Sequence, residues 1–292
     1  MREAPRSRAP LPEEKNMGYK TILVHVDRSP RAATRIDIGR RIARQFDGHL
    51  VGLHAASVTP MPGYMLAVGG ASIADEQRKA ALEDAAAAEQ RFAEIAGRDG
   101  EISIEWRSSR DDAAVVVPLH ARYADLVILG QPAPSGAPGV NREFAGRVLL
   151  TCGRPVLFVP FAGEFGTVGQ RVLVSWNAGR EATNAVTMAL PMLKHASRVD
   201  VVTFNAKSPT HGAVPGADIA VWLARHGVNV QVSEERVADT DIGAHLLSLA
   251  SDLASDLLVM GGYGHSRLAE FVLGGVTRTV LESMTLPVLM AH

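Results

Sequence analysis

The fold is decided by the stretch LLVMGGYG at Leu257–Gly264, which is followed, after nine residues, by GGVT at Gly274–Thr277. The apolar run before the first glycines is typical of a buried parallel strand. Beyond the second glycine pair, apolar residues recur at helical spacing, at Val276, Val280, Leu281 and Met284. The stretch therefore predicts a strand, a glycine-rich loop and a helix, in that order.

The glycines of this stretch are placed to bind phosphate. Glycine at a strand end and at a helix start leaves backbone N–H groups uncovered, and the helix dipole favours an anion there. Thr277, in the first turn of the predicted helix, can place a hydroxyl on the same anion. The pattern is neither G-x-G-x-x-G nor the P-loop, because no lysine follows the glycines. A glycine-rich turn that merely packs closely is the alternative.

The chain is a tandem repeat of two copies. TILVHVD at Thr21–Asp27 recurs 150 residues later as RVLVSWN at Arg171–Asn177. ADLVILG at Ala124–Gly130 recurs 131 residues later as SDLLVMG at Ser255–Gly261. The length of 292 residues also exceeds the usual size of a single core, so two domains of about 150 residues are expected.

The repeat sets the expected domain limits. Domain 1 should span 17–160 and domain 2 should span 171–292, with a glycine-containing linker at 161–170. The first copy is longer than the second, and part of its extra length falls in the helical stretch 74–96.

Strand-like and helix-like segments alternate within each copy. In the second copy the strands are expected at 172–176, 199–204 and 228–232, and the helices at 182–193 and 219–225. Asp241 is expected to cap a further helix. Five strands joined by helical crossovers predict the α/β class, as two tandem, doubly wound, five-stranded parallel-sheet domains of the Rossmann-like type.

The glycine pattern and the tail that follows it resemble the universal stress protein family. The resemblance rests on G-x-x-G, nine residues and a second glycine pair, and then on a closing helix and strand at Gly274–Thr279 and Leu286–Met290. It implies strand order 3-2-1-4-5 in each domain, so that strands 1 and 4 end at one crevice. It also implies ATP or another adenine nucleotide as the ligand, and leaves open Mg²⁺ as its companion. The closing strands of the two copies should meet along their edges, as an intramolecular pseudo-dimer.

The resemblance places the ligand in domain 2. There Asn177 stands where the family has a nucleoside-binding aspartate, and its amide can both donate to and accept from an adenine edge. For Phe204 and Met260 a core position is the alternative to contact with the base. The expected nucleotide-binding residues are Asn177, Phe204, Met260, Gly261, Gly264, His265, Gly274, Gly275, Val276 and Thr277. No residue is assigned a catalytic or metal-binding role.

Domain 1 lacks the glycine loop. After Gly130 it reads QPAPSGAP, and proline has no N–H to give to a phosphate. Arg142 and Glu143 stand where domain 2 has its second glycine pair, and a carboxylate at that place repels phosphate. Asp27, in the position of the nucleoside-binding aspartate, is nevertheless present. One nucleotide per chain is therefore expected, bound in domain 2.

Composition narrows the range of partners and compartments. The formal net charge is −1 and no block of Lys or Arg occurs, which argues against nucleic acid or an anionic membrane as the main partner. No apolar run approaches the roughly 18 residues of a membrane span. The single cysteine, Cys152, excludes an internal disulfide and fits a reducing cytoplasm. Residues 1–16 lack an apolar segment, which predicts a disordered, dispensable tail rather than a secretory signal.

Together these features predict a cytoplasmic stress-response protein whose nucleotide changes its state or its binding to an unidentified protein partner. Two other classes stay open: a slow ATPase or phosphotransferase, and a scaffold without a ligand. Efficient phosphoryl transfer needs a positioned cation and a metal-holding carboxylate. Only Arg267 and Arg278 are cationic around the loop, and no carboxylate stands in an obvious metal position. The sequence also leaves open whether the chain forms a homodimer.

Overall fold

The computed structural model describes residues 18–55, 71–98, 100, 102–132, 140–206, 216–264 and 275–292. The predicted tail at 1–16 lies outside these ranges, as do two residues of the expected site, His265 and Gly274.

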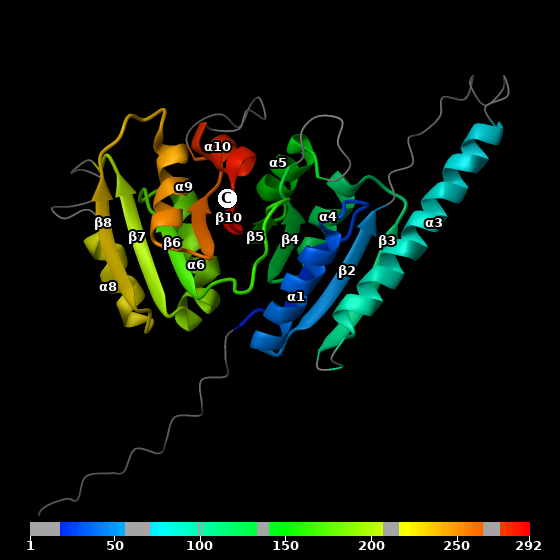
Figure 1. Ribbon diagram of the computed structural model, residues 1–292, viewed down its shortest axis with the longest axis horizontal. Helices are drawn as coiled ribbons and strands as arrows, with labels where there is room; N and C mark the ends of the chain where they lie inside the picture. Colours follow the sequence, from blue (N-terminus) through cyan, green and yellow to red (C-terminus); the bar gives the residue numbers. More distant parts are fainter. Residues whose placement is uncertain are drawn as a thin grey trace, which may run out of the picture.

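One ten-stranded sheet runs through the whole molecule, with the two copies side by side (Figure 1). The first copy contributes β1 (Thr21–His25), β2 (His49–Ala55), β3 (Ser103–Ser109), β4 (Leu126–Gly130) and β5 (Val156–Val159). The second copy contributes β6 (Arg171–Ser175), β7 (Arg198–Phe204), β8 (Val230–Glu235), β9 (Leu257–Gly261) and β10 (Val288–Ala291). The central strands are apolar along their whole length because helices cover both of their faces.

The strand order is β3-β2-β1-β4-β5-β10-β9-β6-β7-β8. Each copy thus has the order 3-2-1-4-5 with parallel neighbours, so the predicted fold class is confirmed. The seam between the copies is the antiparallel pair β5–β10, in which Leu157 lies opposite Leu289. The expectation that the closing strands meet along their edges is therefore confirmed. The pairing removes two strand edges that would otherwise expose unpaired backbone groups.

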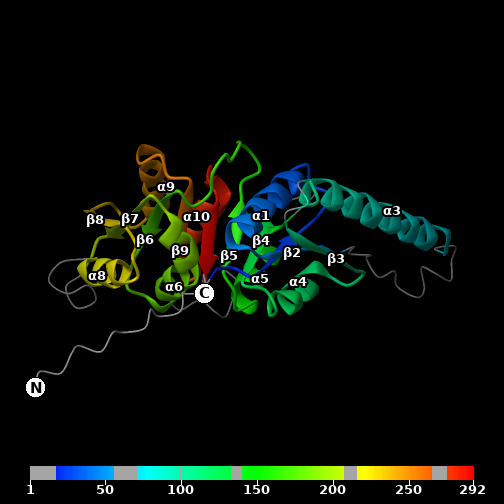
Figure 2. The same cartoon turned by 90° about the horizontal axis from the view of Figure 1, so that it is seen from below.

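Helices lie on both sides of the twisted sheet (Figure 2). They are α1 (Ala32–Phe46), α3 (Ala71–Ala96), α4 (Ala113–Ala121) and α5 (Arg142–Thr151) in the first copy, and α6 (Arg180–His195), α8 (Ala217–Arg225), α9 (Ile242–Asp252) and α10 (Gly275–Ser283) in the second. One hydrophobic core contains α1, α3, α6 and α8, and the other contains α4, α5, α9 and α10. Strand pleating divides the side chains between them: Val24 of β1 enters the first core and Leu23 the second.

The start of α9 shows where the local prediction fails. Asp241 directly precedes the helix, as expected. Its backbone is already helical, however, and its carboxylate accepts the hydroxyl of Thr240 at 3.2 Å instead of an N–H group of the helix. Asp241 therefore marks the start of α9 without capping it.

The segment between the copies is tied to α1. Arg41 donates to the carbonyl oxygens of Phe165 at 2.7 Å and Gly166 at 2.8 Å. Tyr19, just before β1, donates its hydroxyl to the carbonyl of Met188 in α6 at 2.8 Å. These bonds, together with the β5–β10 seam, hold the two domains in one arrangement.

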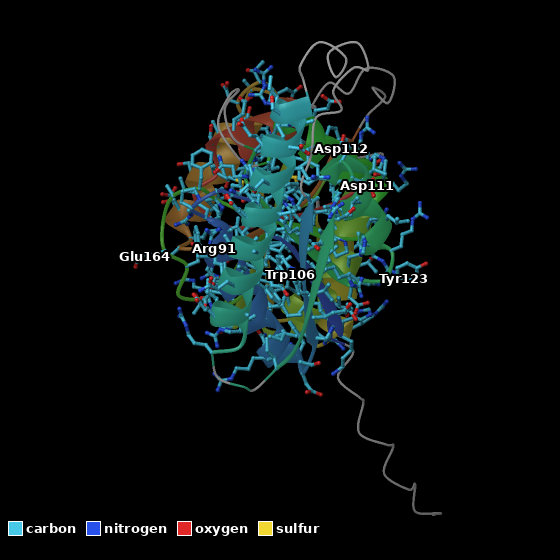
Figure 3. The ribbon with its side chains drawn as sticks, turned by 90° about the vertical axis from the view of Figure 1, so that its right-hand side faces the viewer. Arg91, Trp106, Asp111, Asp112, Tyr123 and Glu164 are labelled. Atoms are coloured by element: carbon cyan, nitrogen blue, oxygen red, sulfur yellow. The ribbon has the colours of Figure 1, made fainter. Side chains whose placement is uncertain are left out.

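The outer edge of domain 1 is covered by α3. Phe92 of this helix packs on Trp106 of β3 with ring centroids 5.4 Å apart, and Figure 3 shows Trp106 beside the helix. The matching helix of domain 2, α8, has 9 residues against 26 in α3, which accounts for much of the greater length of the first copy. None of the described helices, α3 included, is long and apolar enough to cross a bilayer.

Candidate functional site

A cavity of about 270 Å³ lies in domain 2 at the carboxyl ends of β6, β7 and β9. β6 pairs with β7 on one side and with β9 on the other, so the winding of the sheet reverses here. Doubly wound sheets open a crevice at that point because the crossovers on its two sides leave in opposite directions. The first turns of α6, α9 and α10 complete the wall.

Most of the residues expected to contact a nucleotide lie around this cavity. Those that line it are Asn177, Phe204, Met260, Gly261, Gly264, Gly275, Val276 and Thr277. The remaining two, His265 and Gly274, lie outside the described residues. Four further residues that the sequence did not single out also line it: Ser175, Trp176, Ala182 and Ile242. Each lies at a strand end or in the first turn of a helix, and this position could have identified it as a residue of the crevice.

Two backbone amides of the glycine loop are already used within the protein. The N–H of Gly262 donates to the carbonyl of Ala291 at 2.9 Å, and the N–H of Tyr263 donates to Oγ1 of Thr277 at 3.3 Å. The expectation that the loop leaves its amides uncovered is therefore wrong for these two. Within the described part of the chain, the N–H of Gly264 has no acceptor, and Gly264 lines the cavity.

The N-terminus of α10 opens onto the cavity. Gly275, Val276 and Thr277 form its first turn, where the N–H groups have no partner inside the helix. The Thr277 hydroxyl accepts from Tyr263, which leaves its own hydrogen to donate. Among the described residues, no heavy atom lies within 4 Å of the place that a Cβ would take at Gly275. An anion in the cavity would meet the favourable end of this helix dipole.

Asn177 contributes a polar group opposite the glycine loop. Its Oδ1 accepts the N–H of Gly179 at 2.9 Å, a local turn that leads into α6. Its Nδ2 lies 4.0 Å from the place that a Cβ would take at Gly264. The amide donor of Asn177 is therefore the part of this side chain that faces the loop.

Glu181 brings a carboxylate to the same place, which the sequence did not indicate. Its Oε2 lies 3.5 Å from the place of a Cβ at Gly264, while Oε1 pairs with the exposed Arg180 at 3.2 Å. The sequence placed no carboxylate in an obvious metal position, and Glu181 comes close to the loop only through the fold. An acidic residue in the first turn of a helix is common, because the helix dipole favours it. Glu181 therefore did not stand out in the sequence as a site residue. Within the described ranges, no group of three or more His, Cys, Asp or Glu is placed to hold a metal ion.

The matching crevice of domain 1 holds a buried ion pair. The guanidinium of Arg35 donates to Oδ1 of Asp27 at 2.5 Å and to Oγ of Ser29 at 3.1 Å. It also donates to the carbonyl oxygen of His25 at 3.2 Å. The side chain of Arg35 is only 2% exposed, so its charge depends on these partners.

Arg35 occupies the space between the ends of β1 and β4. A Cβ at Gly130, the counterpart of Gly261, would lie 2.7 Å from its Nη1. The residue of domain 2 at the place of Arg35, 150 residues later, is Ala185. The guanidinium therefore takes up space at the strand ends of domain 1, where domain 2 has the short side chain of Ala185.

The protonation states in domain 1 follow from this burial. Burial alone would raise the pKa of Asp27, but the charge of Arg35 and the hydrogen bonds from Ser29 and Arg35 prevail and lower it to about 2. Burial lowers the pKa of His25 to about 4 against the pull of Asp27, and the charge of Arg35 adds to the lowering. The His25 ring packs on Phe144 with centroids 5.2 Å apart. At neutral pH the crevice thus holds a paired carboxylate and guanidinium beside a neutral imidazole.

Fold and crevices define the class: a tandem pair of doubly wound α/β domains, with a cavity at the strand ends of one and a buried ion pair at the strand ends of the other. The model of the universal stress protein family matches residues 18–160 and 170–292. The chain therefore belongs to the universal stress protein family. Among curated proteins, no match to the chain is found.

Solved structures share the fold over nearly the whole chain. A universal stress protein from Archaeoglobus fulgidus DSM 4304 is 15% identical with a TM-score of 0.68, and the match covers 93% of this chain and 95% of that one. A functionally unknown protein from Pseudomonas aeruginosa PAO1 is 16% identical with a TM-score of 0.55, over 93% of this chain and 92% of that one. At these identities the likeness concerns the fold alone.

Proposed function

We propose that the chain binds one adenine nucleotide, ATP, in domain 2, and acts in the cytoplasm as a nucleotide-dependent regulatory protein. The observation that carries this proposal is the contrast between the crevices. In domain 2 the crevice opens into a cavity of about 270 Å³, whereas in domain 1 the buried pair of Asp27 and Arg35 lies at the strand ends. Sites for small molecules usually measure roughly 300–1,000 Å³, so the cavity suits the nucleoside part of such a ligand.

Apolar walls and one amide suit the nucleoside end. Trp176, Phe204 and Met260 line the cavity at the ends of β6, β7 and β9. Such surfaces bury a base, while a few polar groups fix its orientation. The Nδ2 of Asn177, on the side of the cavity toward the glycine loop, is a donor available for a ribose oxygen.

The phosphate end would lie between the glycine loop and α10. The N–H of Gly264, the first-turn amides of α10 and the hydroxyl of Thr277 are donors at this end. Several N–H groups converging at a helix N-terminus bind phosphate because each bond is charge-assisted and the dipole adds to them.

Glu181 fits a divalent cation that accompanies the nucleotide. Mg²⁺ is usually held by one or two carboxylates together with the phosphates of the ligand. Glu181 stands beside Gly264, where its charge would repel a bare phosphate. When bound, the cation would neutralise charge between this carboxylate and the nucleotide.

A regulatory role has more support than phosphoryl transfer, which depends on positioned cations. Of the two arginines around the loop, Arg278 pairs with Glu282 at 2.9 Å, and Arg267 lies outside the described residues.

Titration calorimetry with MgATP tests the proposal, and one nucleotide per chain is expected. Gly264→Val and Gly275→Glu should each weaken binding at least tenfold, or about 1.4 kcal/mol. At Gly264 a Cβ makes only ordinary contacts, 3.5 Å from Glu181 and 4.0 Å from Asn177, so valine fits but extends into the cavity. At Gly275 glutamate has room, and it brings a negative charge to the phosphate position.

Two variants serve as controls. Gly275→Ser adds little bulk and no charge, so it should bind within about twofold of the wild type. Asp27→Asn combined with Arg35→Met, in the crevice of domain 1, leaves no buried charge unpaired and should leave the affinity unchanged. Two nucleotides per chain, or loss of binding in this double variant but not in Gly264→Val, would show that domain 1 binds the ligand.

A further inference from the structure

We propose that Gln131 of domain 1 positions α10 of domain 2 and so sets the affinity of the site for phosphate, an inference that rests on the proposed function. Gln131 directly follows β4, at the place where domain 2 has Gly262, 131 residues later. It therefore belongs to the loop of domain 1 that lacks the glycine pattern. That loop holds the phosphate-binding helix of the other domain.

Gln131 caps the C-terminal end of α10. Its Nε2 donates to the carbonyl oxygens of Leu281 at 3.0 Å and Glu282 at 3.2 Å. The last carbonyls of a helix have no partner within it, so these bonds satisfy groups that α10 cannot satisfy by itself. The Oε1 of Gln131 accepts the N–H of Phe161 at 3.2 Å, and the residue is 5% exposed. A buried amide with both ends bonded is costly to displace.

A second residue of the same loop region holds the same turn. Arg142, which opens α5, forms an ion pair with Glu282. Arg142 stands at the place that Gly274 has in domain 2, 132 residues later. Two residues of domain 1 that stand where domain 2 has glycine thus add contacts to α10.

Domain 1 also supports the glycine loop on its other side. A Cβ at Gly262 would lie 2.6 Å from Cδ2 of Leu149 in α5, so the loop backbone packs directly on this helix. Gly146, one turn earlier in α5, leaves room for the hydroxyl of Tyr263. Gly262 and Tyr263 therefore lie between α5 of domain 1 and α10, to which the Tyr263 N–H is bonded through Thr277.

The two ends of α10 are close enough for one to control the other. The helix has nine residues, about 13 Å, so a shift of its last turn moves the first turn with it. The first turn carries the amides proposed to bind phosphate. The walls proposed to bind the nucleoside come mainly from the ends of β6 and β7, which are separated from β4 in the sheet by β5, β10 and β9. Loss of the Gln131 donors should therefore weaken the binding of phosphate and spare that of the nucleoside.

The test compares ATP with adenosine in the full-length chain by calorimetry. Gln131→Met keeps the length of the side chain but removes its donors. We expect MgATP to bind about fivefold more weakly, as for the loss of a buried hydrogen bond, and adenosine to bind within about twofold of the wild type. Hydrogen exchange of the α10 amides in the ligand-free variant should be faster than in the wild type.

Controls separate positioning from general destabilisation. Ile36→Val, in the buried core of domain 1, should lower stability without changing the ratio of ATP to adenosine affinity. Arg142→Ala should weaken ATP about twofold, because its ion pair is half exposed. Arg147→Ala, on the same helix, is its matched control and should have no effect.

The possible failures are distinguishable. An unchanged affinity ratio in Gln131→Met overturns the positioning role and leaves the proposed nucleotide site standing. If Gln131→Met does not fold, Arg142→Ala takes its place in the test. An equal ratio of ATP to adenosine affinity in Arg142→Ala and Arg147→Ala then overturns the positioning role. A wild-type chain that binds neither MgATP nor adenosine overturns the positioning role together with the proposed function.

Discussion

The two crevices lie at corresponding strand ends of the two domains and differ in the side chains between those ends. In domain 1 a buried pair of Asp27 and Arg35 occupies the space, while in domain 2 Asn177 and Ala185 stand at these places and a cavity opens. On the proposed function, the loop of domain 1 offers fewer donors to a phosphate, and Arg35 also leaves less room for a nucleoside. One long side chain on the first helix is therefore a main difference between the two crevices.

The largest expected effect comes from giving domain 1 the asparagine of domain 2. Asp27→Asn leaves the charge of Arg35 buried without its counter-charge, which should lower the free energy of unfolding by about 3–5 kcal/mol. Denaturant unfolding measures this loss. Adding Arg35→Met to the same chain should recover most of it, because no buried charge remains. A loss below about 1 kcal/mol in Asp27→Asn would show that Arg35 does not depend on the carboxylate.

The second effect concerns acid. His25 has a pKa of about 4 in the folded chain against 6.5 ordinarily, so between these values only the unfolded chain binds the proton. Stability that is complete above pH 6.5 should therefore fall toward pH 4, by up to about 3 kcal/mol. The lowered pKa of Asp27, about 2 against 3.8, adds a loss only at lower pH, below about 3.8. The groups that face His25 electrostatically are Asp27, Arg35 and His54.

Unfolding free energies at about pH 7 and about pH 4.5 measure this effect. His25→Ser introduces the residue that domain 2 has at this place, Ser175. This substitution should remove most of the difference in unfolding free energy between the two pH values that His25 causes. An unchanged difference would assign the acid sensitivity to other groups.

The smallest effect on stability is expected in the open crevice. Asn177 is exposed and makes one local bond to Gly179, so Asn177→Ala should lower the free energy of unfolding by no more than about 1 kcal/mol. It should nevertheless weaken both adenosine and MgATP, about fivefold, because the lost donor serves the nucleoside end. Unfolding and calorimetry on the same variant check this. A large loss of stability with unchanged affinity would give Asn177 a structural role like that of Asp27.

Much of the architecture could be predicted because it follows from periodic patterns. The repeat and the alternation of strands with helices set the order of the sheet, and parallel strands carry their ends to one side. Asn177 follows one apolar run and Gly261 ends another, so it could be predicted that they lie at one crevice. The pairing of β5 with β10 was predicted through the family resemblance.

The side chains that occupy or border the crevices could not be predicted, because the residues they contact are distant from them in the sequence. An arginine in the middle of a helix normally indicates a surface position, since charged residues are seldom fully buried. Arg35 is buried only because Asp27 and Gly130 meet at the strand ends. Likewise, Gln131 bonds to backbone carbonyls of the other copy, and a carbonyl acceptor leaves no mark in the sequence. Glu181 approaches Gly264 only in the folded chain.

Because the β5–β10 seam joins two domains of one chain, the two domains can differ in sequence, which two identical subunits of a homodimer cannot. In a symmetric homodimer every substitution appears on both sides of the twofold axis. The arginine of position 142 would then replace, in both subunits at once, a glycine that we propose to bind phosphate. With both partners on one chain, selection can alter one side and preserve the other. Covalent fusion thus permits a division of labour, in which residues of one copy support the site proposed in the other.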